Sequence, residues 1–284
     1  MIIIDFSQII LANIFVELKN PKDLDLETCR GLVLNSIRLI NSKFKNKYGE
    51  VVLACDSGSF WRKSSYPYYK ANRKKNRDKS TIDWKSIFEI INTVRDEIQE
   101  NFPYRVIRTD GAEADDVIAT LVKRNSVEYI NNGNKILIVS GDKDFIQLLK
   151  YPNVEIWDPI GKRNTVHNNP YGYLSEHILT GDVGDGVPNV LSPDDCLVLS
   201  KRQKPLTKKY KEAFSNGVPE TSEYYANFKR NKLMIDLEMI PENIENSIIE
   251  TYENESNKTK TKLVPYFLKN GLTILFDKIN DFWG

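Results

Sequence analysis

Short aliphatic runs alternate with longer segments of helical periodicity in the first half of the chain, and this alternation constrains the fold more than any other feature. Five runs have the length and composition of buried strands: Met1–Ile4, Val51–Cys55, Arg105–Arg108, Lys135–Ser140 and Val154–Trp157. Apolar residues recur at helical spacing between them, in the segments Leu26–Lys45, Asp83–Glu100 and Ala112–Arg124. Such alternation predicts an α/β fold with helices on the faces of a central sheet.

The strand pattern fades after about residue 165. Proline, asparagine and glycine cluster at Asn168–Pro170 and at Gly181–Pro188, and helical candidates follow at Pro205–Phe214 and Glu220–Lys232. The sequence therefore predicts a larger α/β domain over residues 1–165 and a smaller, mainly helical region over residues 166–284.

Composition excludes several classes of protein. The chain has 284 residues, 40% hydrophobic and 28% charged, which is ordinary for a globular protein. It has no apolar run of membrane-spanning length and does not start like a signal peptide, so a cytoplasmic protein without membrane contact is expected. Three cysteines far apart argue against zinc and for a reducing compartment. Two histidines, His167 and His177, argue against catalysis that uses several histidines.

Acidic residues follow the predicted strands where the strands end. Asp5 follows the first, Asp56 the second, and Asp142 and Asp144 the fourth. Ligands of open α/β sheets bind beyond the carboxyl ends of the strands, so these side chains are expected at one edge. Five further acids complete the candidate set: Glu113, Asp115 and Asp116 at the start of a predicted helix, and Asp182 and Asp185 in the Gly181–Pro188 turn. Acids in a first helical turn also suit the helix dipole, which is an ordinary structural explanation for the first three.

So many carboxylates in one place repel one another unless a cation compensates their charge. Hard oxygen ligands select Mg²⁺ or Mn²⁺ rather than zinc. Two such ions can stabilise the attacking and the leaving oxygen of phosphoryl transfer without any histidine. The set therefore predicts a site for two Mg²⁺ ions, with Mn²⁺ as a substitute. Asp116 is better explained as a supporting group or as a charge on the helix surface.

A basic and aromatic segment follows Asp56. Between Trp61 and Lys79 it carries eight lysines and arginines against one acid, with aromatic rings interleaved. Cations neutralise phosphates and rings stack on unpaired bases, so the segment is expected to hold nucleic acid over the acidic site. Trp61 and Tyr66 are expected to pack in the core instead.

Individual cations of this segment have distinct expected roles. Arg62, Lys70 and Arg73 are expected to contact substrate phosphate, and Lys70 could orient the scissile phosphate or stabilise developing charge. Further phosphate contacts are expected from Lys74, Lys75 and Arg77.

The glycine-rich turn Gly181–Pro188 could be mistaken for a nucleotide-binding loop. It lacks the GK[ST] ending, and no other such motif occurs, which argues against ATP hydrolysis. A turn between helices that exposes amides to a phosphate fits better, with Gly184 and Gly186 as the candidates. An ordinary helix stop is the alternative.

These motifs together resemble the flap endonuclease or 5′-nuclease family, and within it the bacteriophage ribonuclease H branch, over nearly the whole chain. The resemblance rests on Ile4–Gln8, Tyr68–Arg73, Glu113–Asp116, Lys135–Ile138, Asp142–Phe145, Lys150–Val154 and Tyr266–Lys269. It implies a PIN-like fold with a mixed, largely parallel sheet. It also implies a basic arch over about residues 61–84 that passes a single strand, and a helix–three-turn–helix element at the glycine turn that grips a duplex.

The resemblance implies 5′→3′ exonuclease and 5′-flap endonuclease action on DNA and RNA–DNA duplexes, which removes lagging-strand primers. By motif matching, one metal ion is held by Asp5, Asp56, Asp115 and Asp142, with Glu113 acting through water, and a second by Asp144, Asp182 and Asp185. Arg62, Tyr69 and Lys70 match positions near the scissile phosphate.

Partners implied in this way are branched or nicked DNA and RNA–DNA duplex, bound by a monomer, in the host cytoplasm if a phage encodes the chain. A single-stranded-DNA-binding protein is a further candidate, whereas sliding-clamp binding through an amino-terminal extension is not expected. A non-catalytic protein that binds 5′ junctions, a PIN-like single-strand ribonuclease and an aspartyl phosphatase are the alternatives. Asp5 is followed by Phe6-Ser7 rather than by the phosphatase motif DxDx[TV]. The preference between RNA and DNA, and between exonuclease and flap cutting, stays open.

Overall fold

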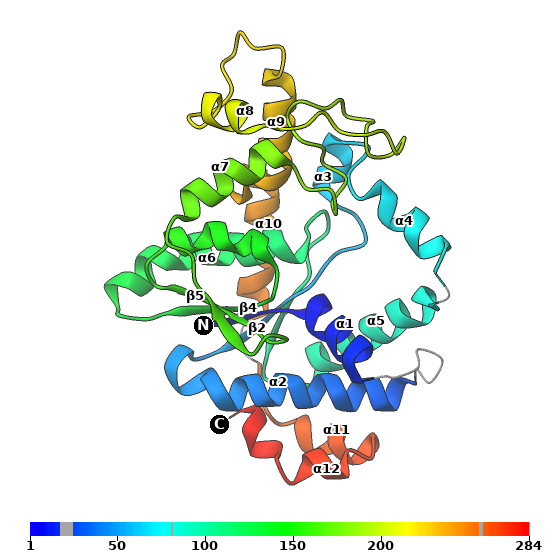
Figure 1. Cartoon of the computed structure of the whole chain (residues 1–284). Coiled ribbons are helices and arrows are strands. Elements are labelled where there is room, and N and C mark those ends of the chain that lie inside the picture. Colours follow the sequence, from blue (N-terminus) through cyan, green and yellow to red (C-terminus); the bar gives the residue numbers. More distant parts are fainter. Residues whose placement is uncertain (18–24, 81, 256–257, 284) are drawn as a thin grey trace.

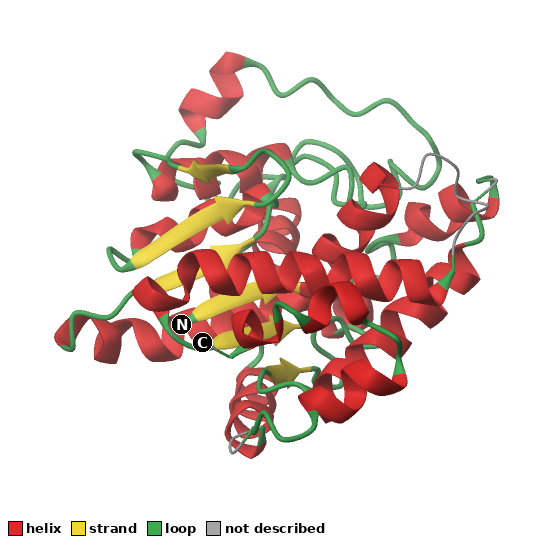
Figure 2. Ribbon diagram, turned by 90° about the horizontal axis from the view of Figure 1, so that it is seen from below, coloured by secondary structure: helices red, strands yellow, loops and turns green. Residues whose placement is uncertain are grey.

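The computed structural model describes the chain except for residues 18–24, 81, 256–257 and 284 and the side chains at 16, 17, 74, 76 and 127. Its centre is a six-stranded sheet in the order β3-β2-β1-β4-β5-β6 (Figure 2). The strands are β1 (Ile2–Asp5), β2 (Val51–Ala54), β3 (Arg105–Ile107), β4 (Ile136–Val139), β5 (Val154–Asp158) and β6 (Arg163–Thr165). Neighbours among β1 to β5 pair in parallel, and β6 pairs antiparallel to β5.

This mixed, mostly parallel sheet confirms the predicted fold class. All five predicted strands occur, and no end differs from the prediction by more than one residue. The edge strand β6 was not predicted, because its residues Arg163-Asn164-Thr165 are polar and largely exposed and carry no aliphatic signal.

Both faces of the sheet are covered by helices, because successive strand residues point to opposite sides. Ile2 and Ile4 pack with α1 (Phe6–Glu17), α2 (Leu26–Tyr48) and α5 (Trp84–Asn101). Ile3 packs on the other side with α6 (Ala114–Asn131), the 3₁₀ helix η2 (Lys143–Lys150) and α10 (Glu242–Asn254). Figure 1 shows α2 and α6 on opposite sides of the strands.

Local capping explains where two of these helices begin. The Asp25 side chain accepts from the amide of Thr28 at the start of α2, and Asp83 accepts from the amide of Ser86 at the start of α5. Helix α1 was not predicted, because apolar residues occur on all of its sides and hide the helical period.

The carboxy-terminal third is mainly helical, as predicted. Helices α7 (Pro170–Thr180), α8 (Lys208–Ala213) and α9 (Tyr225–Ile235) surround a small apolar cluster that includes Leu179 and Phe214. The chain then returns to the sheet through η3 (Leu237–Met239), α10, α11 (Leu263–Lys269), α12 (Thr273–Phe276) and η4 (Ile279–Phe282). Side chains from this last part belong to the two central apolar clusters, so the division at residue 165 stays a prediction about domains.

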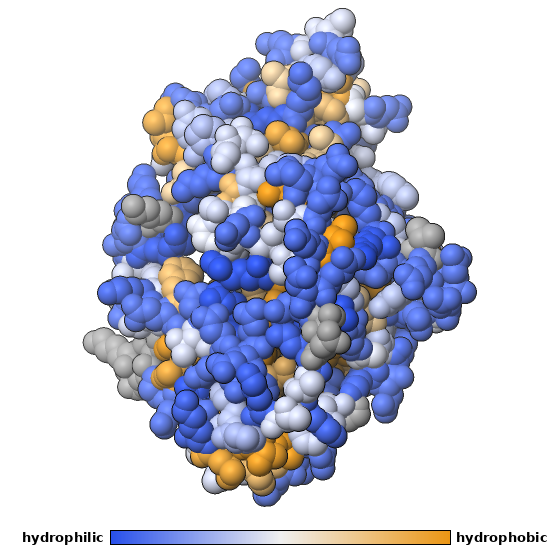
Figure 3. Space-filling view, turned by 180° about the vertical axis from the view of Figure 1, so that it is seen from behind, coloured by the Kyte–Doolittle hydropathy of each residue, from blue (hydrophilic) through white to orange (hydrophobic). Residues whose placement is uncertain are grey.

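The surface is mostly hydrophilic in the view of Figure 3, with an apolar patch at the end of the molecule where α11 and α12 lie. Leu268 and Ile274 on these helices are largely exposed. None of the helices in the described ranges has the length and apolar character needed to cross a membrane.

Candidate active site

A cleft of about 590 Å³ lies at the carboxyl ends of the strands. Asp5 is the last residue of β1, and Asp56 and Asp142 lie two and three residues beyond β2 and β4. The structure brings seven of the predicted metal ligands to the walls of this cleft: Asp5, Asp56, Asp115, Asp142, Asp144, Asp182 and Asp185. We call these seven aspartates the acidic wall. Lys70, Arg73 and Gly184 line the same cleft, so the aspartates and two cations surround one cavity.

Local hydrogen bonds hold Asp5 and Asp56, which lie at the carboxyl ends of the neighbouring strands β1 and β2. Asp5 accepts from the Gln8 amide at 3.2 Å with one oxygen and from the Ser140 hydroxyl at 3.1 Å with the other. Asp56 Oδ1 accepts from the Ala114 amide at 2.9 Å, which ties the end of β2 to the start of α6.

The remaining loops hold their aspartates in a similar way. Asp142 caps η2 by accepting from the Asp144 amide at 2.9 Å, and Asp182 accepts from the Asp185 amide at 3.0 Å. Asp142 therefore fixes the backbone of Asp144 near the cleft, and Asp182 fixes that of Asp185.

Burial and mutual repulsion raise the pKa of several of these aspartates, as expected for carboxylates held close together. Burial, together with the charge of Asp56, raises the pKa of Asp5 to about 7. Burial and the neighbouring Asp142 raise the pKa of Asp144 to about 8. Burial also raises the pKa of Asp115 well above its ordinary value, against the opposing charge of Lys70. Carboxylates that resist ionisation so near one another, with oxygen as their only donor atom, fit hard divalent cations such as Mg²⁺ or Mn²⁺.

The two cleft cations are already paired with acids. Lys70 Nζ contacts Glu113 Oε1 and lies 3.6 Å from Asp185 Oδ2, and Arg73 Nη2 contacts Asp185 Oδ1. Burial lowers the pKa of Lys70, but Asp185 and Glu113 outweigh it and leave that pKa above the ordinary value. Lys70 therefore stays charged at the cleft wall.

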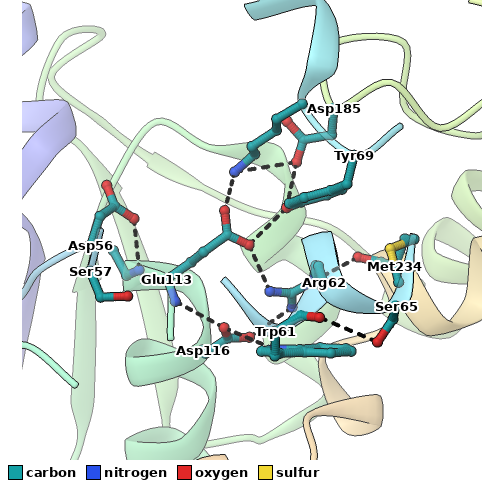
Figure 4. Close-up of polar contacts among 12 residues, drawn as sticks. Asp56, Ser57, Trp61, Arg62, Ser65, Tyr69, Glu113, Asp116, Asp185 and Met234 are labelled. Atoms are coloured by element: carbon teal, nitrogen blue, oxygen red, sulfur yellow. Dashed lines mark hydrogen bonds and ion pairs between the residues drawn. The ribbon is translucent and has the colours of Figure 1, made fainter. Parts of the chain in front are cut away.

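Glu113, which pairs with Lys70, belongs to a buried polar network that also contains Arg62 and Asp116 (Figure 4). Arg62 donates to Glu113 Oε2 at 2.9 Å and to the Met234 carbonyl at 3.1 Å, and its Nη2 lies 2.8 Å from Asp116 Oδ1. Asp116 also accepts from the indole of Trp61 at 3.1 Å. The Tyr69 hydroxyl lies 2.8 Å from Glu113 Oε2 and 3.0 Å from Asp185 Oδ2.

This network places three predicted site residues behind the wall of the cleft. Arg62 is only 2% exposed and is paired with acids and a carbonyl, so its contact with substrate phosphate stays a prediction. Glu113 is 1% exposed and accepts from three donors, so it supports Lys70 from behind the cleft instead of lining it. Tyr69 is buried and connects Glu113 to Asp185. Trp61 and Tyr66 are buried, as predicted.

The glycine turn packs against the base of the predicted arch, which contains α3 (Trp61–Ser65) and α4 (Ala71–Asp78). The Lys70 amide donates to the Asp185 carbonyl at 2.8 Å, and Lys70 itself has a left-handed backbone with φ 54°. Gly186 has φ 77°, and a Cβ there would lie 2.7 Å from the Tyr68 carbonyl. Gly186 is therefore a buried packing position, whereas Gly184 is exposed, and the nucleic-acid role expected of both stays a prediction.

The predicted helix–three-turn–helix element corresponds to α7 and α8 with the segment between them. Residues 181–207, all of them described, form turns and loops that connect the two helices. Among the remaining cations of the arch, Lys75 on α4 is exposed and Arg77 lies over the Phe88 ring at 5.6 Å. The side chain of Lys74 lies outside the described residues.

His177 is a site residue that sequence reasoning missed. Its Nδ1 lies 3.4 Å from Asp144 Oδ1 and its Nε2 lies 3.9 Å from Asp182 Oδ2. The available signal was its place in the last turn of the helix before Gly181-Asp182.

Comparison with known families decides the class of protein. Residues 1–175 match the family described as the 5′-3′ exonuclease, N-terminal resolvase-like domain, and residues 174–282 match the family described as T4 RNase H, C terminal. The chain belongs to the 5′-nuclease family. This 5′-nuclease is 37% identical to the ribonuclease H of Enterobacteria phage T4, in an alignment that covers 99% of this chain and 95% of that protein.

Two solved structures from bacteriophage T5 share the fold of this 5′-nuclease. A protein co-crystallized with metal ions matches with a TM-score of 0.63 and 17% identity, over 90% of this chain and 99% of that one. A flap endonuclease in a pseudo-enzyme-product complex with DNA and metal ions matches with a TM-score of 0.61 and 19% identity, over 89% and 98%. The chain is thus a nuclease with the PIN-like architecture of its family.

Proposed function

We propose that this nuclease is a Mg²⁺-dependent 5′→3′ exonuclease and 5′-flap endonuclease that removes RNA primers and flaps from DNA during replication. The cleft in which seven aspartates face Lys70 and Arg73 is the observation that carries the proposal. The aspartates need bound metal cations to offset their repulsion. The positive charges of Lys70 and Arg73 suit an anionic phosphodiester. The T5 flap endonuclease complexed with DNA and metal ions supports a DNA substrate.

In this proposal the aspartates form two groups of ligands. Asp5, Asp56, Asp115 and Asp142 form an inner site at the strand ends, and Asp144, Asp182 and Asp185 form an outer site. Two divalent ions, when bound there, stabilise charge on the attacking and the leaving oxygen of the phosphodiester.

Residues of the arch provide the positive charge on the other side of the substrate. Lys70 keeps its proton and lies at the cleft wall, where its ammonium offsets charge that develops on the scissile phosphate. Glu113 holds Lys70 in place, and Arg62 and Tyr69 hold Glu113. Arg73 and the exposed Lys75 hold the strand on either side of the reaction.

A direct test uses four substrates with the full-length chain: a 5′-labelled flap, a nicked RNA–DNA duplex, the matching nicked DNA duplex and a free single strand of RNA. Each is incubated with Mg²⁺, with Mn²⁺ and with chelator. Cleavage of the flap and both duplexes, dependent on a divalent ion, is expected. Binding without cleavage would favour a silent junction-binding protein, and cleavage of the free RNA alone would favour a single-strand ribonuclease.

A further inference from the structure

The imidazole of His177 lies between two acids that the proposed function assigns to the outer metal site. It belongs to the last turn of α7, whereas Asp144 lies near the start of η2 and Asp182 follows the end of α7. One ligand atom from each of the three residues lies within 4.8 Å of the other two. Adjacent ligands at roughly 2.0–2.2 Å from one ion lie only about 3–3.5 Å apart, so the three groups would have to approach one another by about 1 Å to bind the same ion.

Hydrogen bonding does not explain this arrangement. The distance from Nε2 to Asp182 Oδ2 is 3.9 Å, which is too long for a hydrogen bond. Nδ1 is buried and has no hydrogen-bond partner in the part of the chain that the structure describes, although Asp144 Oδ1 is 3.4 Å away. A buried ring nitrogen without a partner is costly unless something else binds it.

The ring is held in this place by its surroundings. The Tyr173 ring, one helical turn earlier, packs edge-on against the His177 ring at 5.8 Å, and the His167 ring packs on Tyr173 at 5.3 Å. His167 therefore belongs to the same row of rings but makes no ion pair with an acid in the described part of the chain. It provides a matched control.

We propose that His177 is a nitrogen ligand of the outer metal site and makes that site selective for Mn²⁺ over Mg²⁺. This inference rests on the proposed function, because it takes Asp144 and Asp182 as ligands. Mg²⁺ prefers oxygen ligands, whereas imidazole nitrogen suits transition metals. The inner site offers only carboxylate oxygens, so the two sites differ in donor chemistry: the inner site suits Mg²⁺, and the outer site suits Mn²⁺.

The test measures Mn²⁺ binding to the full-length chain without nucleic acid. Free Mn²⁺ is followed by its paramagnetic resonance signal at a constant excess of Mg²⁺, for the unaltered chain, His177→Gln, His177→Ala and the control His167→Gln. We expect Mn²⁺ affinity at one site to fall by at least about tenfold in both His177 variants, as for loss of groups that support a metal, and to be unchanged in His167→Gln. The visible absorption of bound Co²⁺ should change in the same two variants, because a nitrogen donor is lost.

Thermal melting with and without Mg²⁺ shows whether each variant is folded and still binds Mg²⁺. Equal Mn²⁺ affinity in the unaltered chain and in folded His177→Gln would overturn the role of His177 and leave the proposed function intact. Failure of the unaltered chain to bind any divalent ion would instead overturn the two-metal proposal, and the His177 inference with it. An equal loss in His167→Gln would also overturn it, because the effect would then belong to the row of rings.

Discussion

The two sides of the cleft are built in different ways. Backbone amides and a serine hydroxyl hold the acidic wall, and its aspartates lie where strands and loops end. The basic part of the cleft depends on long side chains whose positions are set by ion pairs, such as Lys70 with Glu113 and Arg73 with Asp185. The acidic wall is thus organised by the fold, whereas the basic side is organised partly by the acids that it faces. Substitution of an aspartate in the acidic wall should therefore slow cleavage. Substitutions of the arch cations should differ from one another, because some lower stability, some slow cleavage and some weaken substrate binding.

The largest effect is expected from Asp142→Asn. Loss of a carboxylate from the inner site should slow cleavage by roughly three orders of magnitude, since a bound metal supplies several kcal/mol of charge stabilisation. Duplex binding, measured by fluorescence anisotropy, should stay within a few-fold of that of the unaltered chain. Asp277→Asn, an exposed acid far from the cleft, is the control. Full activity of Asp142→Asn would refute the metal assignment.

Arg62→Met tests whether the first cation of the arch is structural. Its removal leaves Glu113 and Asp116 buried without their partner, which should lower the free energy of unfolding by about 3–5 kcal/mol. Arg124→Met, which breaks an exposed pair with Glu253, should cost at most about 1 kcal/mol. Urea denaturation compares the two variants. A stable Arg62→Met chain that binds substrate weakly would instead support the predicted phosphate contact of Arg62.

Lys70→Ala separates chemistry from binding on the basic side. Removal of a donor that stabilises developing charge should lower kcat by roughly 10²-fold, with a much smaller change in substrate affinity. Lys75→Ala, which removes an exposed cation from α4, should weaken binding and leave kcat nearly unchanged. Single-turnover kinetics and anisotropy give the two quantities. Equal losses in rate and affinity for Lys70→Ala would reduce Lys70 to a phosphate anchor.

The most gradual effect concerns pH. The pKa of Asp5 is raised to about 7 and that of Asp144 to about 8, above an ordinary value of 3.8, so the folded chain binds protons that the unfolded chain has released. Stability of the metal-free chain should therefore fall as pH rises between about 4 and 8, by at most about 1.4 kcal/mol per pH unit for each group. Mg²⁺ favours the charged carboxylates, so the increase in Tm that it causes should grow with pH. Scanning fluorimetry from pH 6 to pH 8 with Mg²⁺ or chelator measures this trend, and a constant increase would contradict it.

The sequence predicts the acidic wall well, because its positions depend on local structure. Strand ends in a parallel sheet meet at one edge, so Asp5, Asp56 and Asp142 could be placed together without knowledge of the tertiary fold. Asp182 and Asp185 could be added to this group because they lie in the glycine-rich turn Gly181–Pro188, and the structure places both in the same cleft.

The basic side was harder to predict, because the role of a cation depends on its partners. Arg62 and Lys70 look alike in a basic segment, yet one is buried beside Asp116 and the other lines the cleft. These partners come from α6, some fifty residues further along the chain, and no local pattern encodes that contact. His177 was missed partly for the same reason, since one of its two acid neighbours, Asp144, belongs to η2 and lies far from it in the sequence.

The hydrogen bond from the Lys70 amide to the Asp185 carbonyl joins the backbone of the arch directly to the glycine turn. We expect a duplex that moves the turn on binding to move the backbone of Lys70 as well. Recognition of the double-stranded part of a substrate would then be coupled to alignment of the reactive cation, so we expect a strand bound without its duplex to be poorly aligned for cutting.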